Sequence, residues 1–157
     1  MDQLPLHLHK DPEPFYTFAK DIIDRTHDLV CGYKFQIAHY SAAGKERELF
    51  QSIAYIKATY PHIPVILDAK RGDIAISSGQ YAVEAFERYQ ADAVTVNPYF
   101  GLDSLQPFLD RKDKGVIILC RTSNPGGAEI QNIKTADGGP IYEVVARKAA
   151  VEWNSNG

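Results

Sequence analysis

Short apolar runs that alternate with amphipathic segments are the feature that most constrains how this chain folds. The apolar runs lie at residues 29–34, 64–68, 93–97 and 115–120. Between two of them, Leu49, Ile53 and Ile56 recur at helical spacing. Strands that are apolar along their whole length are typical of a parallel sheet covered by helices on both faces. The sequence therefore predicts an α/β fold with about four parallel strands.

Four other helices are expected from the same kind of apolar spacing. The first is predicted to begin with Asp11 as its cap and Pro12 as its first residue. Its predicted apolar face consists of Phe15, Phe18, Ala19 and Ile22. The later helices are marked by Ala82, Ala85, Phe86 and Tyr89, by Leu105, Phe108 and Leu109, and by Ile141, Val145 and Ala149. Residues 121–140 are predicted to form a loop, and Trp153 is predicted to lie in the core.

Composition limits the domain organisation and the partners. The chain has 157 residues, 45% of them hydrophobic and 24% charged, which suits one globular domain over residues 1–157 with no second domain. A net charge of −3 argues against a surface for nucleic acid or for anionic lipid. No apolar run approaches the roughly 20 residues that span a bilayer. We expect no nucleic-acid partner and no membrane association.

Cysteine usage and the N-terminus favour a cytoplasmic protein. Cys31 and Cys120 lie inside apolar runs, so both are predicted to be buried free thiols in a reducing compartment. Residues 1–5 form neither a basic nor an apolar segment, so no signal peptide is expected.

Polar residues at the predicted strand ends favour a barrel over an open sheet. Lys34, Asp68, Asn97 and Arg121 each lie at the C-terminal end of an apolar run. In a (β/α)8 TIM barrel such ends meet at one mouth, where active sites lie. An open doubly wound sheet usually carries a Gly-rich turn, and no GxGxxG occurs here. Because complete barrels need roughly 200–250 residues, we expect part of a (β/α)8 barrel, with the remaining strands missing.

The densest chemical signal is the segment 68–73, Asp-Ala-Lys-Arg-Gly-Asp. Strand periodicity predicts that Asp68 and Lys70 point to the same side, with Asp73 in the following loop and Lys34 on the neighbouring strand. An isolated D-x-K-x-x-D pattern is more often a surface ion-pair cluster. Asn97 and Ser123, at or just past later strand ends, favour an active site instead.

Several motifs in order resemble the orotidine 5′-phosphate decarboxylase family, in particular its bacterial subgroup with the sequence D-A-K-R-G-D-I. They lie at residues 33–34, 67–74, 94–99 and 120–126. The resemblance implies a (β/α)8 barrel, a homodimer and no cofactor. It also implies conversion of orotidine 5′-monophosphate to uridine 5′-monophosphate (UMP) and CO₂, in de novo pyrimidine synthesis.

The resemblance also implies roles for individual residues. Lys70 matches the lysine that protonates C6 of the pyrimidine, and Asp68 matches the aspartate near the substrate carboxylate. Lys34 matches the lysine that binds ribose and positions Asp68. Asp73 matches the aspartate that reaches into the neighbouring subunit's site.

The remaining matches concern substrate binding. Ser123 matches the serine at the pyrimidine edge, Ser77 replaces a threonine near the ribose, and Asn97 is the other substrate-binding candidate. The family's ribose-binding aspartate on the first strand and its phosphate-binding glutamine and arginine find no match. We therefore expect residues 1–157 alone to be poorly stable or self-associating and to have little activity.

Three other interpretations remain. A Mg²⁺-dependent sugar-phosphate decarboxylase or aldolase of the same superfamily shares D-x-K-x-x-D, although residues 122–126 favour a pyrimidine-binding loop. A non-catalytic fragment that only associates with other chains is a different class of function. A metal-dependent hydrolase could use His7 and His9, but these histidines are more simply solvated surface residues.

Overall fold

A computed structural model describes residues 4–154. Its helices are α1 (Pro14–Thr26), α2 (Ile37–Ala42), α3 (Glu46–Thr59), α4 (Ala75–Val83), α5 (Leu102–Leu109), α6 (Ala128–Gln131) and α7 (Ile141–Arg147). Its strands are β1 (Tyr33–Gln36), β2 (Val65–Arg71), β3 (Ala93–Val96) and β4 (Gly115–Ile118). Short 3-10 or π-helical turns lie at Leu6–Leu8, Glu84–Arg88, Pro98–Phe100, Pro125–Gly127 and Lys148–Glu152. The signal-peptide prediction depends partly on residues 1–3, which lie outside the described range.

The strands form one sheet in the order β1-β2-β3-β4, which confirms the predicted α/β fold with four parallel strands. β1 and β2 pair in parallel, with Tyr33 opposite Val65 and Gln36 opposite Asp68. Sequential strands are neighbours because a helical connection returns the chain to the same end of the sheet each time. Within the described residues, no helix is both long enough and apolar enough to cross a membrane.

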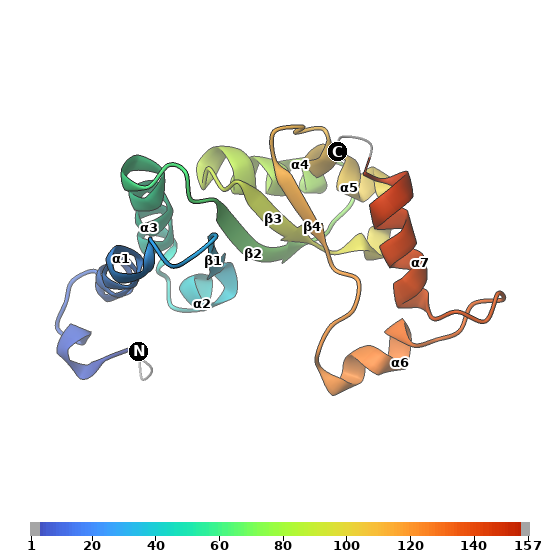
Figure 1. The fold of residues 1–157 in the computed structure, drawn as a ribbon, viewed down its shortest axis with the longest axis horizontal. Helices are drawn as coiled ribbons and strands as arrows, with labels where there is room; N and C mark the ends of the chain where they lie inside the picture. The colour runs from blue at the N-terminus through green and yellow to red at the C-terminus, as the bar shows by residue number, and fades with distance from the viewer. Residues whose placement is uncertain (1–3, 155–157) are drawn as a thin grey trace. The chain divides into compact units, whose positions relative to one another are not determined.

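The chain divides into two compact units. The first contains the chain up to Ala69 together with Ala82–Val94. Helices α1 and α3 contact each other in it and are neighbours in Figure 1, and its buried core also includes Val65 and Leu67 of β2. Leu49, Ile53 and Ile56 are completely buried there, as predicted. The predicted face of Ala82, Ala85, Phe86 and Tyr89 is also confirmed as buried.

Helix α1 begins later than predicted and buries a different face. Asp11 is not its cap; the Asp11 carboxylate instead accepts the Glu13 N–H at 2.7 Å, and Pro14 is the first helical residue. The predicted face is wrong in part, because Phe18 is 39% and Ile22 45% exposed, whereas Ala19 and Ile23 are buried. Helical spacing alone did not indicate which apolar stripe packs on α3.

The first predicted strand is wrong in its position. Residues 29–32 form a turn and bend before β1, and Leu29 is 78% exposed. Cys31 is consequently exposed rather than buried, and Cys120 is half-buried; both thiols are free. Pairing with β2 starts only at Tyr33, so the ladder, rather than local hydrophobicity, sets where the strand begins. Lys34 is therefore the second residue of β1 and not its last.

The second unit contains Lys70–Tyr81 and the chain from Thr95 onward. Leu105 and Phe108 of α5 and Trp153 are buried, as predicted. Strand β4 is less buried than its apolar sequence indicates, since Ile117 is 41% exposed. The predicted loop at residues 121–140 contains a 3-10 turn, α6 and an antiparallel bridge between Lys134 and Pro140.

Candidate active site

Strands β1 and β2 bring a buried carboxylate next to a solvated ammonium group. Lys34 Nζ lies 3.6 Å from Asp68 Oδ2. The Lys34 side chain is 60% exposed, whereas that of Asp68 is only 7% exposed. The predicted proximity of Lys34 and Asp68 is thus confirmed. A buried carboxylate with a cationic partner keeps a fixed negative charge where little water can reorganise around it.

Lys70 lies two residues after Asp68 on the same strand, and its backbone is left-handed. Its φ of +48° is uncommon for a residue with a side chain and costs about 1–2 kcal/mol. The Lys70 N–H donates to the Thr95 hydroxyl at 2.9 Å. Because φ at Lys70 departs from extended geometry, strand alternation alone does not fix the direction of its side chain, and the shared side with Asp68 stays a prediction.

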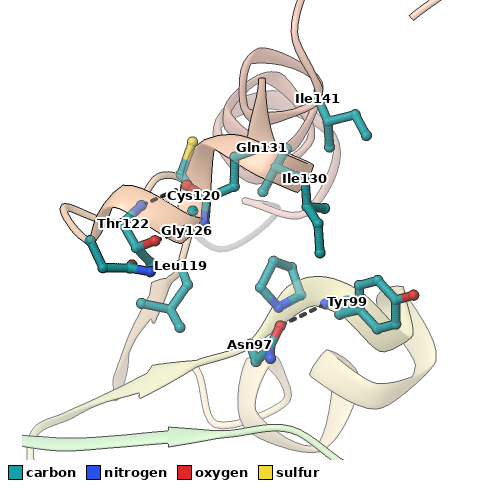
Figure 2. A pocket seen from close by; sticks show the side chains of 13 residues that line it. Asn97, Tyr99, Leu119, Cys120, Thr122, Gly126, Ile130, Gln131 and Ile141 are labelled. Carbon is teal, nitrogen blue, oxygen red and sulfur yellow. Dashed lines mark hydrogen bonds between the residues drawn. The ribbon is translucent and has the colours of Figure 1, made fainter. Parts of the chain in front are cut away.

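The end of β2 is held closely against the end of β3 within the second unit. The Asn97 N–H donates to the Arg71 carbonyl at 2.7 Å. A Cβ at Gly72 would lie 3.0 Å from Asn97 Cβ and 3.2 Å from the Asn97 carbonyl oxygen, so Gly72 leaves room for this approach. The Asn97 side-chain oxygen accepts the Tyr99 N–H at 3.0 Å (Figure 2). Asn97 thus shapes the turn after β3 with its oxygen.

Asp73 and Ser77 lie in the segment that leaves β2 and enters α4. Asp73 is half-buried, and one of its carboxylate oxygens accepts the Ile74 N–H at 2.8 Å. Ser77 is exposed in α4. Large apolar side chains around this segment are also exposed, with Ile74 at 59% and Ile76 at 83%. The segment presents polar groups and apolar surface together.

Ser123 lies in the loop that follows β4. It is exposed and lines a cavity of about 520 Å³ together with Arg121, Thr122, Asn124, Pro125 and Ala128. Arg121 stacks on Tyr142, 4.9 Å from the ring centre. Ser123 is therefore an exposed polar residue at the wall of this cavity.

A side-chain clamp from α6 orders this loop. Gln131 accepts the Thr122 N–H at 2.9 Å and donates to the Thr122 hydroxyl at 2.8 Å. A Cβ at Gly127 would lie 2.6 Å from the Thr122 hydroxyl oxygen, so the clamp needs glycine there. Figure 2 shows Thr122 and Gln131 beside a second cavity of about 340 Å³, which Leu119, Ile130 and Ile141 also line.

Two polar residues of this region were missed from the sequence. Thr95 interrupts an apolar strand and is 6% exposed, and a buried hydroxyl inside a valine-rich strand is a signal that could have been used. Gln131 carried no such signal, because its role depends on a contact across the loop. Among residues 4–154 no group of three or more His, Cys, Asp or Glu is arranged to hold a metal ion.

Comparison with known proteins identifies the family. The model of the "Orotidine 5'-phosphate decarboxylase / HUMPS family" matches residues 11–157. An orotidine 5′-phosphate decarboxylase of Cellvibrio japonicus is 61% identical over 145 residues, covering 92% of this chain and 53% of the relative. One of Aromatoleum aromaticum is 55% identical over 155 residues, covering 99% of this chain and 57% of the relative. The chain thus spans about half the length of these curated relatives.

Solved structures agree with the sequence match. The OMP decarboxylase of Leishmania donovani superimposes with a TM-score of 0.84 at 42% identity, over 90% of this chain and 56% of that chain. A putative orotidine-monophosphate decarboxylase of Toxoplasma gondii superimposes with a TM-score of 0.87 at 36% identity. The match covers 97% of this chain and 52% of that chain. The predicted partial (β/α)8 architecture is confirmed by these neighbours. The chain belongs to the orotidine 5′-phosphate decarboxylase / HUMPS family.

Proposed function

We propose that this chain carries the reaction centre of an orotidine 5′-phosphate decarboxylase that works without a cofactor. Its substrate is orotidine 5′-monophosphate, and its products are UMP and CO₂. The observation that carries the proposal is the pairing of buried Asp68 with Lys34 at 3.6 Å, two residues before Lys70 on β2. The sequence D-A-K-R-G-D-I at 68–74 supports assignment to the bacterial subgroup. The cytoplasm is the proposed site of this step.

The chemistry needs a cation that can release a proton. Breaking the bond between C6 and the carboxylate carbon releases CO₂ and leaves the electron pair on C6. The Lys70 ammonium stabilises that developing charge and then donates a proton to C6, which gives UMP. Solvent returns the proton to the lysine. An arginine would keep the charge but effectively could not donate the proton.

Other residues bind and orient the substrate. Lys34 holds Asp68 and binds the ribose, while Asp68 lies near the substrate carboxylate. Ser123 binds the pyrimidine edge from the exposed loop after β4. Asn97 is placed to donate from its side-chain nitrogen, since its oxygen is bonded to the Tyr99 N–H.

A homodimer completes the proposed site, with Asp73 and Ser77 reaching the ribose in the partner's site. Exposed apolar side chains near Asp73 support it, because a second copy would cover them. They are Ile74, Ile76, Tyr99, Phe100 and Leu102, between 42% and 83% exposed. We treat the chain as part of a single barrel domain in this dimer.

Substitution of Lys70 tests the proposal. Because the chain spans half of its relatives, we would join it to the segments of the Cellvibrio japonicus relative that it does not match. In this chimaera Lys70→Ala should lower kcat by several orders of magnitude, and Lys70→Arg should do little better. Lys112→Ala, at an exposed lysine, is the control. Activity of Lys70→Ala within about tenfold of the parent, roughly 1.4 kcal/mol, contradicts the proposal.

Mixed dimers test the role of Asp73. Lys70→Ala and Asp73→Ala chimaeras should each be nearly inactive. After subunit exchange, a heterodimer has one site with both changes and one with neither, so activity should return. If exchange is verified and activity stays absent, Asp73 does not act across an interface.

A further inference from the structure

Lys70 has a backbone conformation that its own side chain disfavours, so something must hold it there. Its φ of +48° lies in the region that favours glycine. Such strain persists where neighbouring structure determines the backbone, and it is concentrated at functional sites. The group that meets the Lys70 N–H is the Thr95 hydroxyl, 2.9 Å away.

Thr95 is an unusual residue for its position. β3 has the sequence Ala-Val-Thr-Val, and Val94 and Val96 on either side are completely buried. A third valine would fit the strand and bury the same volume. Thr95 is itself buried at 6% exposure, so its hydroxyl needs a partner inside the protein. The Lys70 N–H is such a partner.

The chain just after Lys70 is fixed to the same strand end. The Arg71 carbonyl accepts the Asn97 N–H, and Gly72 packs against Asn97. These contacts hold residues 71 and 72 by their backbones, through the N–H, carbonyl and Cβ of Asn97 rather than through its amide group. The Thr95 hydroxyl, by contrast, is a side-chain group that bonds the left-handed peptide of Lys70 itself.

We propose that Thr95 is a positioning residue for Lys70, whose hydroxyl holds the left-handed backbone and so sets the direction in which the lysine side chain leaves β2. This inference rests on the proposed function, because that function gives Lys70 a proton to deliver to one carbon atom. Proton transfer needs the donor within hydrogen-bond reach of that atom, and small displacements lower the rate strongly. In this proposal Thr95 acts on Lys70 through the backbone N–H that its hydroxyl accepts.

Two variants of matched shape test the inference. Thr95→Val removes the hydroxyl and keeps the volume, while Thr95→Ser keeps the hydroxyl. Thr26→Val is the control, because the Thr26 hydroxyl bonds the Ile22 carbonyl of α1 and the Tyr33 hydroxyl of β1, which belong to the other compact unit from Lys70. Amide hydrogen exchange of Lys70 is measured in the same chimaera, because residues 1–157 alone are expected to be poorly stable. We expect exchange at Lys70 to be about 10–100-fold faster in Thr95→Val and nearly unchanged in Thr95→Ser and Thr26→Val.

Kinetics of the chimaera provide the second measurement. Thr95→Val should lower kcat about 10–100-fold with KM within about threefold, and Thr95→Ser should restore kcat. Unchanged Lys70 exchange in Thr95→Val, or failure of serine to restore either measurement, overturns the inference. Faster exchange with unchanged kcat also overturns it, since Thr95 would then be merely structural. An active Lys70→Ala chimaera would instead overturn the proposed function, and the exchange result would still decide whether Thr95 holds the Lys70 backbone.

Discussion

Helices α3 and α7 carry the same kind of apolar repeat but differ in what covers it. Leu49, Ile53 and Ile56 of α3 are completely buried. None of the residues of α7, all of them described, is buried, and two of its apolar residues, Ile141 and Val145, line the cavity of about 340 Å³. An apolar repeat predicts that a helix forms, because one face prefers to leave water. Whether that face is covered depends on the partner that the fold supplies.

Truncating one isoleucine in each helix should give the largest contrast. Ile53→Ala removes a completely buried side chain and leaves a cavity, so the free energy of unfolding should fall by about 2–5 kcal/mol. Ile141→Ala removes a half-buried side chain that already borders a cavity, so the loss should be about 1 kcal/mol or less. Urea titration followed by circular dichroism measures both. Equal losses would mean that the two helices are equally well packed.

Glu48 shows how α3 also organises α1. Its buried carboxylate accepts the Phe15 N–H at 2.8 Å and the Tyr16 N–H at 3.1 Å, and it pairs with Lys45 at 2.6 Å. These amides belong to the first turn of α1, which lacks a side-chain cap from its own N-cap residue. The carboxylate of α3 thus serves as the cap of α1.

Removing this carboxylate should have the next largest effect. Glu48→Ala leaves two amides and an ammonium group without their acceptor, and the free energy of unfolding should fall by about 1–3 kcal/mol. Glu46→Ala, two residues earlier in α3, should change it by less than about 0.5 kcal/mol. If both variants lose the same amount, Glu48 is not a cap and its contacts are incidental.

The sequence predicted the elements better than their contacts. Four strands, the helical face of α3 and the buried residues of α5 followed from apolar spacing, because burial of whole strands and helix faces repeats along the chain. The start of α1 and the position of β1 did not follow. Both depend on residues distant in sequence, namely Glu48 for the α1 amides and β2 for the register of β1.

In the candidate site, too, some features could be predicted from the sequence and others could not. The proximity of Lys34 and Asp68 was predictable, because neighbouring parallel strands bring such residues together. The left-handed Lys70 was not, since nothing in Asp-Ala-Lys-Arg requires a positive φ. Likewise, the Gln131 clamp on Thr122 depends on how the loop folds back on α6.

Breaking that clamp should affect its loop locally rather than the whole protein. Gln131→Ala removes two hydrogen bonds to Thr122, together worth about 1–2 kcal/mol. Amide exchange at Thr122 should become about tenfold faster, while the urea midpoint hardly moves. The control is Gln106→Ala, which removes an exposed bond from α5 to its C-cap residue Asp110. Unchanged exchange at Thr122 would show that the loop is ordered by other contacts.

The smallest expected effect is a change of the free energy of unfolding with pH that comes from Tyr40, a half-buried residue of α2. The pKa of Tyr40 is raised from 10.0 to about 12, chiefly by burial; a bond to Ser52 lowers it in part, and the Glu48 charge raises it. Between pH 10 and 12 the folded protein therefore keeps a proton that the unfolded chain has lost. The free energy of unfolding should fall as pH rises through this interval, and Tyr40 should have no such effect below pH 10.

Tyr40→Phe isolates this contribution, because the ring keeps its packing against Phe15, 5.5 Å away between centres. Near pH 8 the two proteins should differ only by the lost hydroxyl bond. At pH 11 the wild type should have lost about 1 kcal/mol more than Tyr40→Phe, since a tenfold difference in proton binding is worth about 1.4 kcal/mol. Urea titrations at both pH values measure the difference. If the two proteins lose stability in parallel up to pH 11, the Tyr40 hydroxyl ionises as readily in the folded protein as in the unfolded chain, and the α2–α3 contact admits more water than its burial implies.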